Sequence, residues 1–378
     1  MLTALYNTII VSNGNLTAGK AVILKAGKID AIVNEAEIPA DAERINLNLA
    51  LLAPGLIDLQ IYGAGGSLFG GLPSTQALQQ METTLLQQGC TGFLATVATN
   101  SDEVVLKAIA AAKAYRSKSI GNFLGLHLEG PYLNAARKGA HPAKYIKKAT
   151  LNEVKHWIEL ANGEIKMITL APELQDQEVI DYLHQQNIIL SSGHSDATYV
   201  QGKAFLNKPV QAVTHLYNAM PPMHHREPGI IPAIFEERPY TSIVADGIHV
   251  NFTMIALAKR QLGNKLFLIT DAVTEATEGT YQHQFTGDRY TMPDGTLSGS
   301  ALTMLNAVKN CVNKVGIDMP EAINMATLYP AQLAALTSKG KVEAGYDADL
   351  IIFDPEFNFL SSVLNGTLHH TNKINPII

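Results

Sequence analysis

From residue 55 onward the sequence alternates strand-length apolar runs with helical stretches, and this alternation restricts the fold more than any other feature. Alternating β and α units are typical of a parallel sheet covered by helices. The apolar runs lie at 55–63, 91–96, 123–130, 165–172, 188–194, 212–218, 241–249 and 266–272. Helical stretches lie at 74–88, 102–116, 151–161, 177–186 and 252–262. Eight such units over roughly 250 residues predict an α/β fold, a (β/α)8 barrel of the TIM type.

Both ends of the chain have strand character outside this alternation. Short apolar runs at 2–11, 21–24 and 29–33, separated by Gly and Asn-Gly, predict antiparallel strands before the barrel. Runs at 349–353 and 362–364 have the same character. Because the last two follow a complete barrel, we expect them to join the N-terminal strands in one small β-domain.

A segment at 273–295 rich in Gly, Thr and aromatic residues follows the eighth run and predicts a hairpin insertion before a helix that starts near Thr303. We therefore predict two domains. Residues 1–53 and 337–378 would form the small β-domain, and residues 54–336 would form the barrel.

Composition limits the functional classes. Apolar residues make up 47% of the chain and charged residues 16%, which predicts a large core and excludes a disordered chain. No apolar run approaches the roughly 18–20 residues of a membrane span, and the N-terminus does not resemble a signal peptide, so we expect a cytoplasmic protein. A net charge of −6 argues against nucleic acid or an anionic membrane as partner. Cys90 and Cys311 are predicted to be buried thiols.

Catalytic side chains of such barrels project from the C-terminal ends of the strands. Glu129, His194 and His215 stand there and supply one oxygen and two imidazoles, a typical ligand set for a catalytic divalent metal. The carboxylate of Asp271 is then free to act as a base. A single histidine in an apolar run is usually a packed core residue, but burying all these groups together without a cation would be costly.

Three neighbouring residues have more than one interpretation. His127 is interpreted as a ligand, a partner of a ligand or a core residue, and we favour the partner of a ligand. Asp246 precedes Gly247, and an Asp-Gly pair commonly stabilises a turn. Asp58 is interpreted as a hydrogen-bond acceptor for nearby backbone N–H groups.

Two basic stretches follow the third and sixth strands, at 137–141 and 221–226. Basic residues often only cover a solvated face. In a chain of negative net charge, however, positive groups over the barrel mouth favour an anionic substrate. Arg226 has the shape to bind a phosphate or carboxylate through two hydrogen bonds. His141 is expected to polarise a carbonyl.

Several motifs together resemble the N-acetylglucosamine-6-phosphate deacetylases of the amidohydrolase superfamily. They are APGLIDLQ at 53–60, HLEGP at 127–131, SGHS at 192–195, THLYNAM at 214–220, REPG at 226–229, DGIH at 246–249, TDA at 270–272, GTLSGS at 295–300 and GYDADL at 345–350. The resemblance covers nearly the whole chain. It implies a distorted (β/α)8 barrel with a small β-sandwich made from both termini, and a homodimer or larger homo-oligomer.

Carried over by position, the resemblance places the metal on Glu129, His194 and His215 and the acid/base on Asp271. Substrate contacts are implied at Ala140, His141, Asn218, Ala219, Arg226, His249, Leu297, Ser298 and Gly299. Many amidohydrolases have His-x-His after the first strand, whereas this chain has Gln60 and Tyr62 there. We therefore expect one divalent metal, Zn²⁺ before Fe²⁺, Mn²⁺ or Co²⁺.

The implied reaction is hydrolysis of the acetamide of N-acetylglucosamine 6-phosphate to glucosamine 6-phosphate and acetate. Two alternatives stay open. A cyclic amidase or deaminase would need the metal and Asp271 but no phosphate site, and a non-catalytic binding module would need neither a complete ligand set nor a base. The sequence does not show whether Arg226 serves its own subunit or a neighbouring one.

Overall fold

The computed structural model describes residues 2–277 and 279–370. Its largest sheet has eight parallel strands in the order β17-β16-β15-β14-β13-β12-β11-β8. They are β8 Leu56–Ile61, β11 Cys90–Ala98, β12 Phe123–Glu129, β13 Ile165–Leu170, β14 Ile189–Ser192, β15 Ala212–Val213, β16 Tyr240–Val244 and β17 Leu266–Ile269. The backbone N–H of Asp271 donates to the Gln60 carbonyl at 3.0 Å and closes the barrel. Each predicted run overlaps one of these strands, so the predicted barrel is confirmed.

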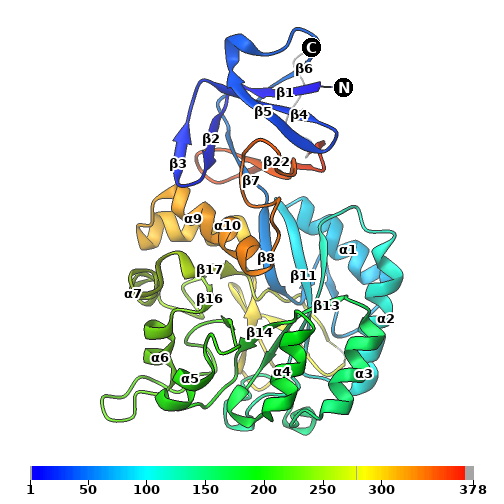
Figure 1. The fold of residues 1–378 in the computed structure, drawn as a ribbon, viewed down its shortest axis with the longest axis vertical. Helices are drawn as coiled ribbons and strands as arrows, with labels where there is room; N and C mark the ends of the chain where they lie inside the picture. The colour runs from blue at the N-terminus through cyan, green and yellow to red at the C-terminus, as the bar shows by residue number, and fades with distance from the viewer. Residues whose placement is uncertain (1, 278, 371–378) are drawn as a thin grey trace.

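Helices cover the outside of the barrel (Figure 1). They are α1 Thr75–Leu86, α2 Asp102–Arg116, α3 Leu151–Ala161, α4 Gln177–Gln185, α5 Tyr199–Phe205, α6 Ile230–Glu237, α7 Phe252–Leu262, α8 Met304–Asn310, α9 Met319–Ala326 and α10 Leu328–Leu333. Side-chain caps explain where several begin: the Ser74 and Thr150 hydroxyls each accept a backbone N–H from the first turn. Among the described helices, none has the length and apolar character needed to cross a membrane.

Two further sheets lie outside the barrel, one made of N-terminal strands alone and one that combines both ends of the chain. Their strand orders are β5-β4-β1-β6 and β23-β22-β21-β7-β2-β3. The strands are β1 Leu2–Tyr6, β2 Ile9–Ser12, β3 Asn15–Thr17, β4 Lys20–Lys25, β5 Lys28–Asn34, β6 Glu43–Asn46, β7 Leu51–Pro54, β21 Leu350–Phe353, β22 Phe359–Leu364 and β23 Thr367–His370. Leu5, Leu52 and Leu350 belong to one buried cluster between the sheets, which therefore form a β-sandwich. The domain boundaries at 53/54 and 336/337 stay predictions, and residues 371–378 lie outside the described part.

The pairing of the N-terminal strands differs in part from the prediction. The apolar run at 2–11 is divided at Asn7, whose φ of 55° turns the chain, so that β1 and β2 enter different sheets. β1 pairs in parallel with β6, and β2 pairs in parallel with β7. The prediction of antiparallel strands is confirmed for the pairs β1–β4, β4–β5 and β2–β3, whereas the two parallel pairs were not predicted. An asparagine tolerates the left-handed conformation, and it was the signal for a break inside this run.

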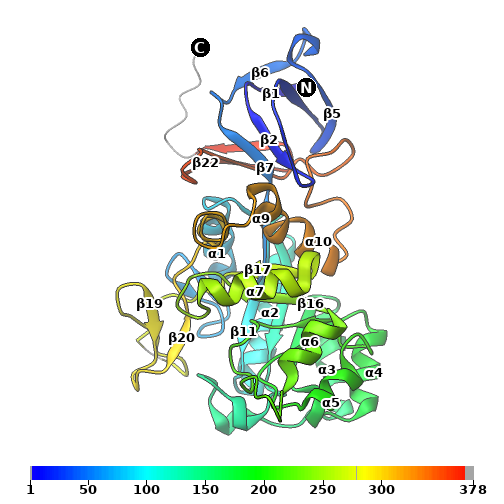
Figure 2. The ribbon, with the colours of Figure 1, turned by 90° about the vertical axis from the view of Figure 1, so that its left-hand side faces the viewer.

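The sandwich lies at one end of the molecule, with α9 and α10 between it and the barrel (Figure 1). β7 leads directly into β8 through Gly55. A Cβ atom at Gly55 would lie 1.9 Å from Thr91 Oγ1, so only glycine fits this junction. The predicted insertion contains two short strands, β18 Gln284–Phe285 and β19 Arg289–Thr291, and β20 Leu297–Ser300 follows it and completes their sheet, which stands out from the side of the barrel (Figure 2). α8 begins after Thr303, as predicted.

Candidate active site

Four barrel strands bring the proposed ligands and base to one end of the barrel. Glu129 is the last residue of β12, and His194, His215 and Asp271 each follow their strands by two residues. Three of these four have an unusual backbone: φ is 48° at His194, 34° at His215 and 55° at Asp271. Non-glycine residues rarely adopt this region, and where they do they are often part of a functional site. The turn at each strand end aims the side chain inward instead of continuing the strand.

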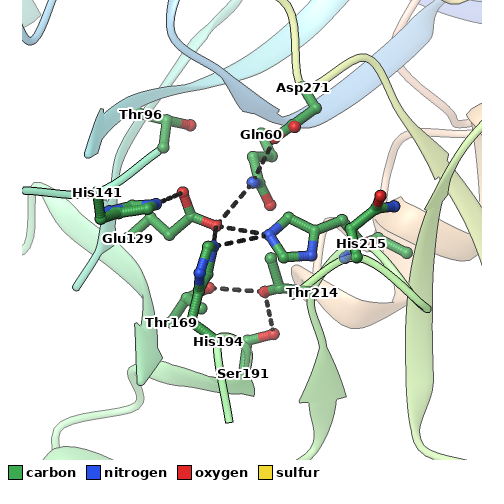
Figure 3. Close-up of polar contacts among 12 residues, drawn as sticks. Gln60, Thr96, Glu129, His141, Thr169, Ser191, His194, Thr214, His215 and Asp271 are labelled. Atoms are coloured by element: carbon green, nitrogen blue, oxygen red, sulfur yellow. Dashed lines mark hydrogen bonds and ion pairs between the residues drawn. The ribbon is translucent and has the colours of Figure 1, made fainter. Parts of the chain in front are cut away.

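The carboxylate of Glu129 lies at the centre of three imidazoles (Figure 3). Its Oε1 is 3.0 Å from His215 Nε2 and 3.6 Å from His194 Nε2, and its Oε2 is 3.2 Å from His141 Nε2. The Nε2 atoms of His194 and His215 are 3.2 Å apart. All four side chains are buried. Hydrogen bonds to the three imidazoles outweigh the effect of burial and hold the pKa of Glu129 well below its usual range.

This donor set fits a divalent cation. The ligand atoms of Glu129, His141 and His194 lie within 4.8 Å of one another. His194 Nδ1 is 2.7 Å from the Arg137 carbonyl, to which it donates, so Nε2 is the ring nitrogen available to a cation. At His215, burial lowers the pKa, but the hydrogen bond and charge of Glu129 outweigh it and raise the pKa to about 9. Without a cation, a proton on His215 therefore balances the carboxylate.

Gln60 stands between the two carboxylates of the site. Its Nε2 lies 3.1 Å from Glu129 Oε1 and 2.6 Å from Asp271 Oδ1 (Figure 3). The Tyr62 hydroxyl donates to Glu129 Oε2. The two side chains at the usual His-x-His positions thus act as hydrogen-bond donors to Glu129, where imidazoles would be ligands.

Asp271 and His141 have shifted protonation equilibria. Burial raises the pKa of Asp271, and the nearby charge of Glu129 adds to the rise. Burial and the neighbouring His194 lower the pKa of His141 to about 4. His141 is therefore a neutral imidazole at pH 7, and Asp271 has a higher proton affinity than an exposed aspartate. A neutral imidazole such as His141 suits the role of a hydrogen-bond donor, and a carboxylate with a raised pKa such as Asp271 suits the role of a general base.

His127 makes no hydrogen bond to a proposed ligand among the described residues, which supports its interpretation as a core residue over the favoured one as a partner of a ligand. Its Nδ1 is 3.0 Å from the Leu59 carbonyl and its Nε2 is 2.7 Å from Thr169 Oγ1, a fully satisfied core histidine. Burial lowers its pKa to about 4. Thr169 continues this network by a hydrogen bond to Thr214, beneath His215 (Figure 3).

The two aspartates have the structural roles predicted for them. Asp246 accepts the backbone N–H groups of the turn that follows and also lies 2.6 Å from His249 Nδ1, so it orients that ring. Asp58 accepts from the backbone of Gln60 and from the backbone and hydroxyl of Thr270. Asp58 thereby ties β8 to the chain segment that carries Asp271.

One cavity contains the proposed ligands and the base together with most of the predicted substrate contacts. Its lining includes Ala140, His141, Asn218, Ala219, His249, Leu297, Ser298 and Gly299. Arg226 is not among the lining residues and lies on an exposed loop. Arg137 is paired with Asp196 at 2.6 Å, so the predicted basic stretch contributes fewer free charges than expected.

Sequence reasoning missed part of the cavity wall. Leu68, Gly70 and Ala98 form an apolar part of it, and Val273, Tyr281 and His283 come from the insertion. The spacing of Tyr281 and His283, two residues apart in an extended segment, was a signal that both side chains face the same side.

The sequence matches the model of the Amidohydrolase family over residues 51–373. The chain belongs to this family. This amidohydrolase is 35% identical over 378 residues to N-acetylglucosamine-6-phosphate deacetylase of Haemophilus influenzae, covering 97% of this chain and 99% of that one. It is 31% identical over 370 residues to N-acetylgalactosamine-6-phosphate deacetylase of a Shewanella species, covering 95% and 94%. The crystal structure of N-acetylglucosamine-6-phosphate deacetylase from Pasteurella multocida superposes with a TM-score of 0.93 at 33% identity, covering 98% of this chain and 100% of that one.

Proposed function

We propose that this amidohydrolase hydrolyses the acetamide of N-acetylglucosamine 6-phosphate to acetate and glucosamine 6-phosphate. The observation that carries the proposal is the convergence of Glu129, His194 and His215 beside Asp271 in a closed barrel. The match with deacetylases over nearly the whole chain supports the substrate.

Glu129, His194 and His215 would hold one divalent metal, with Zn²⁺ as the first candidate. His141 lies close enough to Glu129 to be a further neighbour of the ion. When bound, such a cation lowers the pKa of water and polarises a carbonyl. Gln60 and Tyr62 support a single ion, because both contact Glu129 as hydrogen-bond donors.

Asp271 is the proposed general base and acid. Its carboxylate takes a proton from water as the water attacks the amide carbon, and returns that proton to the leaving amine. The raised pKa of Asp271 favours both transfers, since the group must bind and release a proton near neutral pH. A neutral His141 carries a single N–H, and we propose that this proton lies on Nδ1, which has no partner among the described residues, and is donated to the oxyanion that develops on the carbonyl.

The remaining cavity residues would hold the sugar phosphate. Ala140, Asn218, Ala219, His249 and the Leu297–Gly299 turn are the proposed contacts. Arg226 lies outside this cavity on its exposed loop, so we propose that it binds the phosphate in the site of a neighbouring subunit. A homodimer or larger assembly would then be required for full activity. We propose a cytoplasmic location, where sugar phosphates are formed and retained.

The galactose epimer is a second candidate substrate, because one relative of similar identity carries its name. Acetate release should be measured with N-acetylglucosamine 6-phosphate, N-acetylgalactosamine 6-phosphate and unphosphorylated N-acetylglucosamine, using metal-reconstituted protein. The proposal expects the first to be the best substrate. Preference for the galactose epimer would change the assigned sugar, and equal rates with the unphosphorylated sugar would remove the phosphate from the proposal.

A further inference from the structure

The insertion supplies a second polar wall of the cavity, away from Glu129. Tyr281 and His283 line the cavity and are 6% and 5% exposed. Their rings stack at 5.9 Å with an interplanar angle of 14°, and Tyr281 stands edge-on to His141 at 6.3 Å. A continuous row of rings thus runs from His141, at the end where the amide reacts, to His283. If the amide reacts beside His141, we expect the rest of the sugar to extend along this row of rings toward His283.

Hydrogen bonds to neighbouring residues hold Tyr281 and His283 in place. The Tyr281 hydroxyl donates to the Thr99 carbonyl at 2.8 Å. His283 Nδ1 lies 2.9 Å from Ser298 Oγ, and the His283 carbonyl accepts the backbone N–H of Ala276 at 3.0 Å. The rings of both residues are therefore held before any ligand enters, which is what selective recognition requires.

The imidazole of His283 has one nitrogen that makes no hydrogen bond within this wall. His283 Nε2 has no hydrogen-bond partner among the described residues, although the side chain is buried against the cavity. Because His283 lines the cavity, the free hydrogen-bonding capacity of Nε2 is available to a ligand group. Burial lowers the pKa of His283 to about 4, so the ring is neutral at pH 7. A neutral imidazole matches a hydroxyl group, which can donate or accept, better than it matches a phosphate.

We propose that His283 Nε2 hydrogen-bonds a ring hydroxyl of the sugar and thereby selects among amino-sugar phosphates. This inference rests on the proposed function. In the substrate, the amide on C2 and the phosphate-bearing arm on C5 leave opposite corners of the ring. One edge between them carries O3 and O4, and the other carries O1. Because His283 lies on one wall of the cavity, it would face only one of these two edges of the sugar ring.

The test combines variants of His283 with substrates that each lack one hydroxyl. His283→Asn keeps a polar atom near Nδ1 for Ser298 and removes the atom at Nε2, whereas His283→Gln keeps a polar atom near Nε2. The deoxy analogues lack O1, O3 or O4. With the wild type we expect one analogue to lose on the order of tenfold in kcat/KM. With His283→Asn that analogue and the full substrate should differ by less than about twofold, and His283→Gln should keep part of the discrimination.

A merely structural role for His283 would lower kcat/KM for all substrates alike and leave the ratios between analogues unchanged. That outcome, or equal discrimination in wild type and His283→Asn, would overturn the inference while the proposed function stands. If the Asn variant does not fold, His283→Phe preserves the stack on Tyr281 and gives the same comparison. A wild type that releases no acetate from any of these substrates would overturn the proposed function and the inference together.

Discussion

The Nε2 atoms of His194 and His215 lie 3.2 Å apart, closer than two imidazole lone pairs would approach without a shared proton or cation. Glu129 Oε1 completes the triangle at 3.0 and 3.6 Å. These three atoms come from the ends of three different strands, so their convergence depends on the closed barrel. Binding of a cation should therefore stabilise the fold itself.

Zn²⁺ at a hundredfold excess over its Kd should raise the free energy of unfolding by about 2.7 kcal/mol. His194→Ala should abolish this increase, whereas His156→Ala, on the exposed side of α3, should preserve it. Denaturant unfolding with and without metal measures the effect. Elemental analysis after reconstitution should give about one ion per chain, and a stable value near two would contradict the interpretation of Gln60 and Tyr62.

Asp271→Asn should retain metal and substrate binding and lose about 10²- to 10⁴-fold in kcat, the usual contribution of general acid–base catalysis. Steady-state kinetics with N-acetylglucosamine 6-phosphate measures the loss. Asp30→Asn, on an exposed strand position, is the matched control and should leave kcat unchanged. Activity of Asp271→Asn within a few-fold of wild type would mean that another residue moves the proton.

Arg226→Ala should lose on the order of ten- to a hundredfold in kcat/KM for the phosphorylated sugar, mainly through KM, because the hydrogen bond to a charged group is remote from the amide. Hydrolysis of unphosphorylated N-acetylglucosamine should barely change. Arg260→Ala, another exposed arginine, serves as the control. Equal losses with both sugars would show that Arg226 does not bind the phosphate.

Asp58 should make the stability depend on pH. Burial raises its pKa to about 7, against about 3.9 in an unfolded chain. Since the folded state binds the proton more tightly, stability falls as the pH rises from about 4 to 7, by up to about 1.4 kcal/mol per pH unit. Asp58→Asn should remove this slope in urea unfolding measured between pH 5 and 7.5. Parallel profiles for variant and wild type would show that Asp58 ionises at an ordinary pKa.

The barrel and its reactive end were predictable because both depend on patterns within short segments. Apolar runs define the strands, and the polar residues at their ends meet because parallel strands share one end. The interpretation of Asp246 as a local acceptor succeeded for the same reason, since it accepts two backbone N–H groups of the turn that follows it, whereas Asp58 has one such local partner, the backbone of Gln60, and also binds the distant Thr270.

Features that depend on long-range packing were not predictable. Nothing in the local sequence indicates positive φ at His194, His215 and Asp271, where tertiary contacts impose the conformation. His283 belongs to an insertion whose path over the barrel mouth is set by contacts such as that with Ser298. The parallel partners of β1 and β2 are also distant in sequence, so a strand pattern alone could not assign them.

The place of β7 in the sandwich has a consequence for synthesis of the protein. β7 lies between β2 and β21 and continues into β8, which carries Gln60. A ribosome releases β2 and β7 long before β21, because the sequence of the barrel lies between them. Until β21 has been synthesised, one edge of β7 therefore has no partner strand. Unpaired strand edges promote aggregation. The sheet that holds β7 can therefore be completed only after the whole barrel, which lies between β7 and β21 in the sequence, has been synthesised.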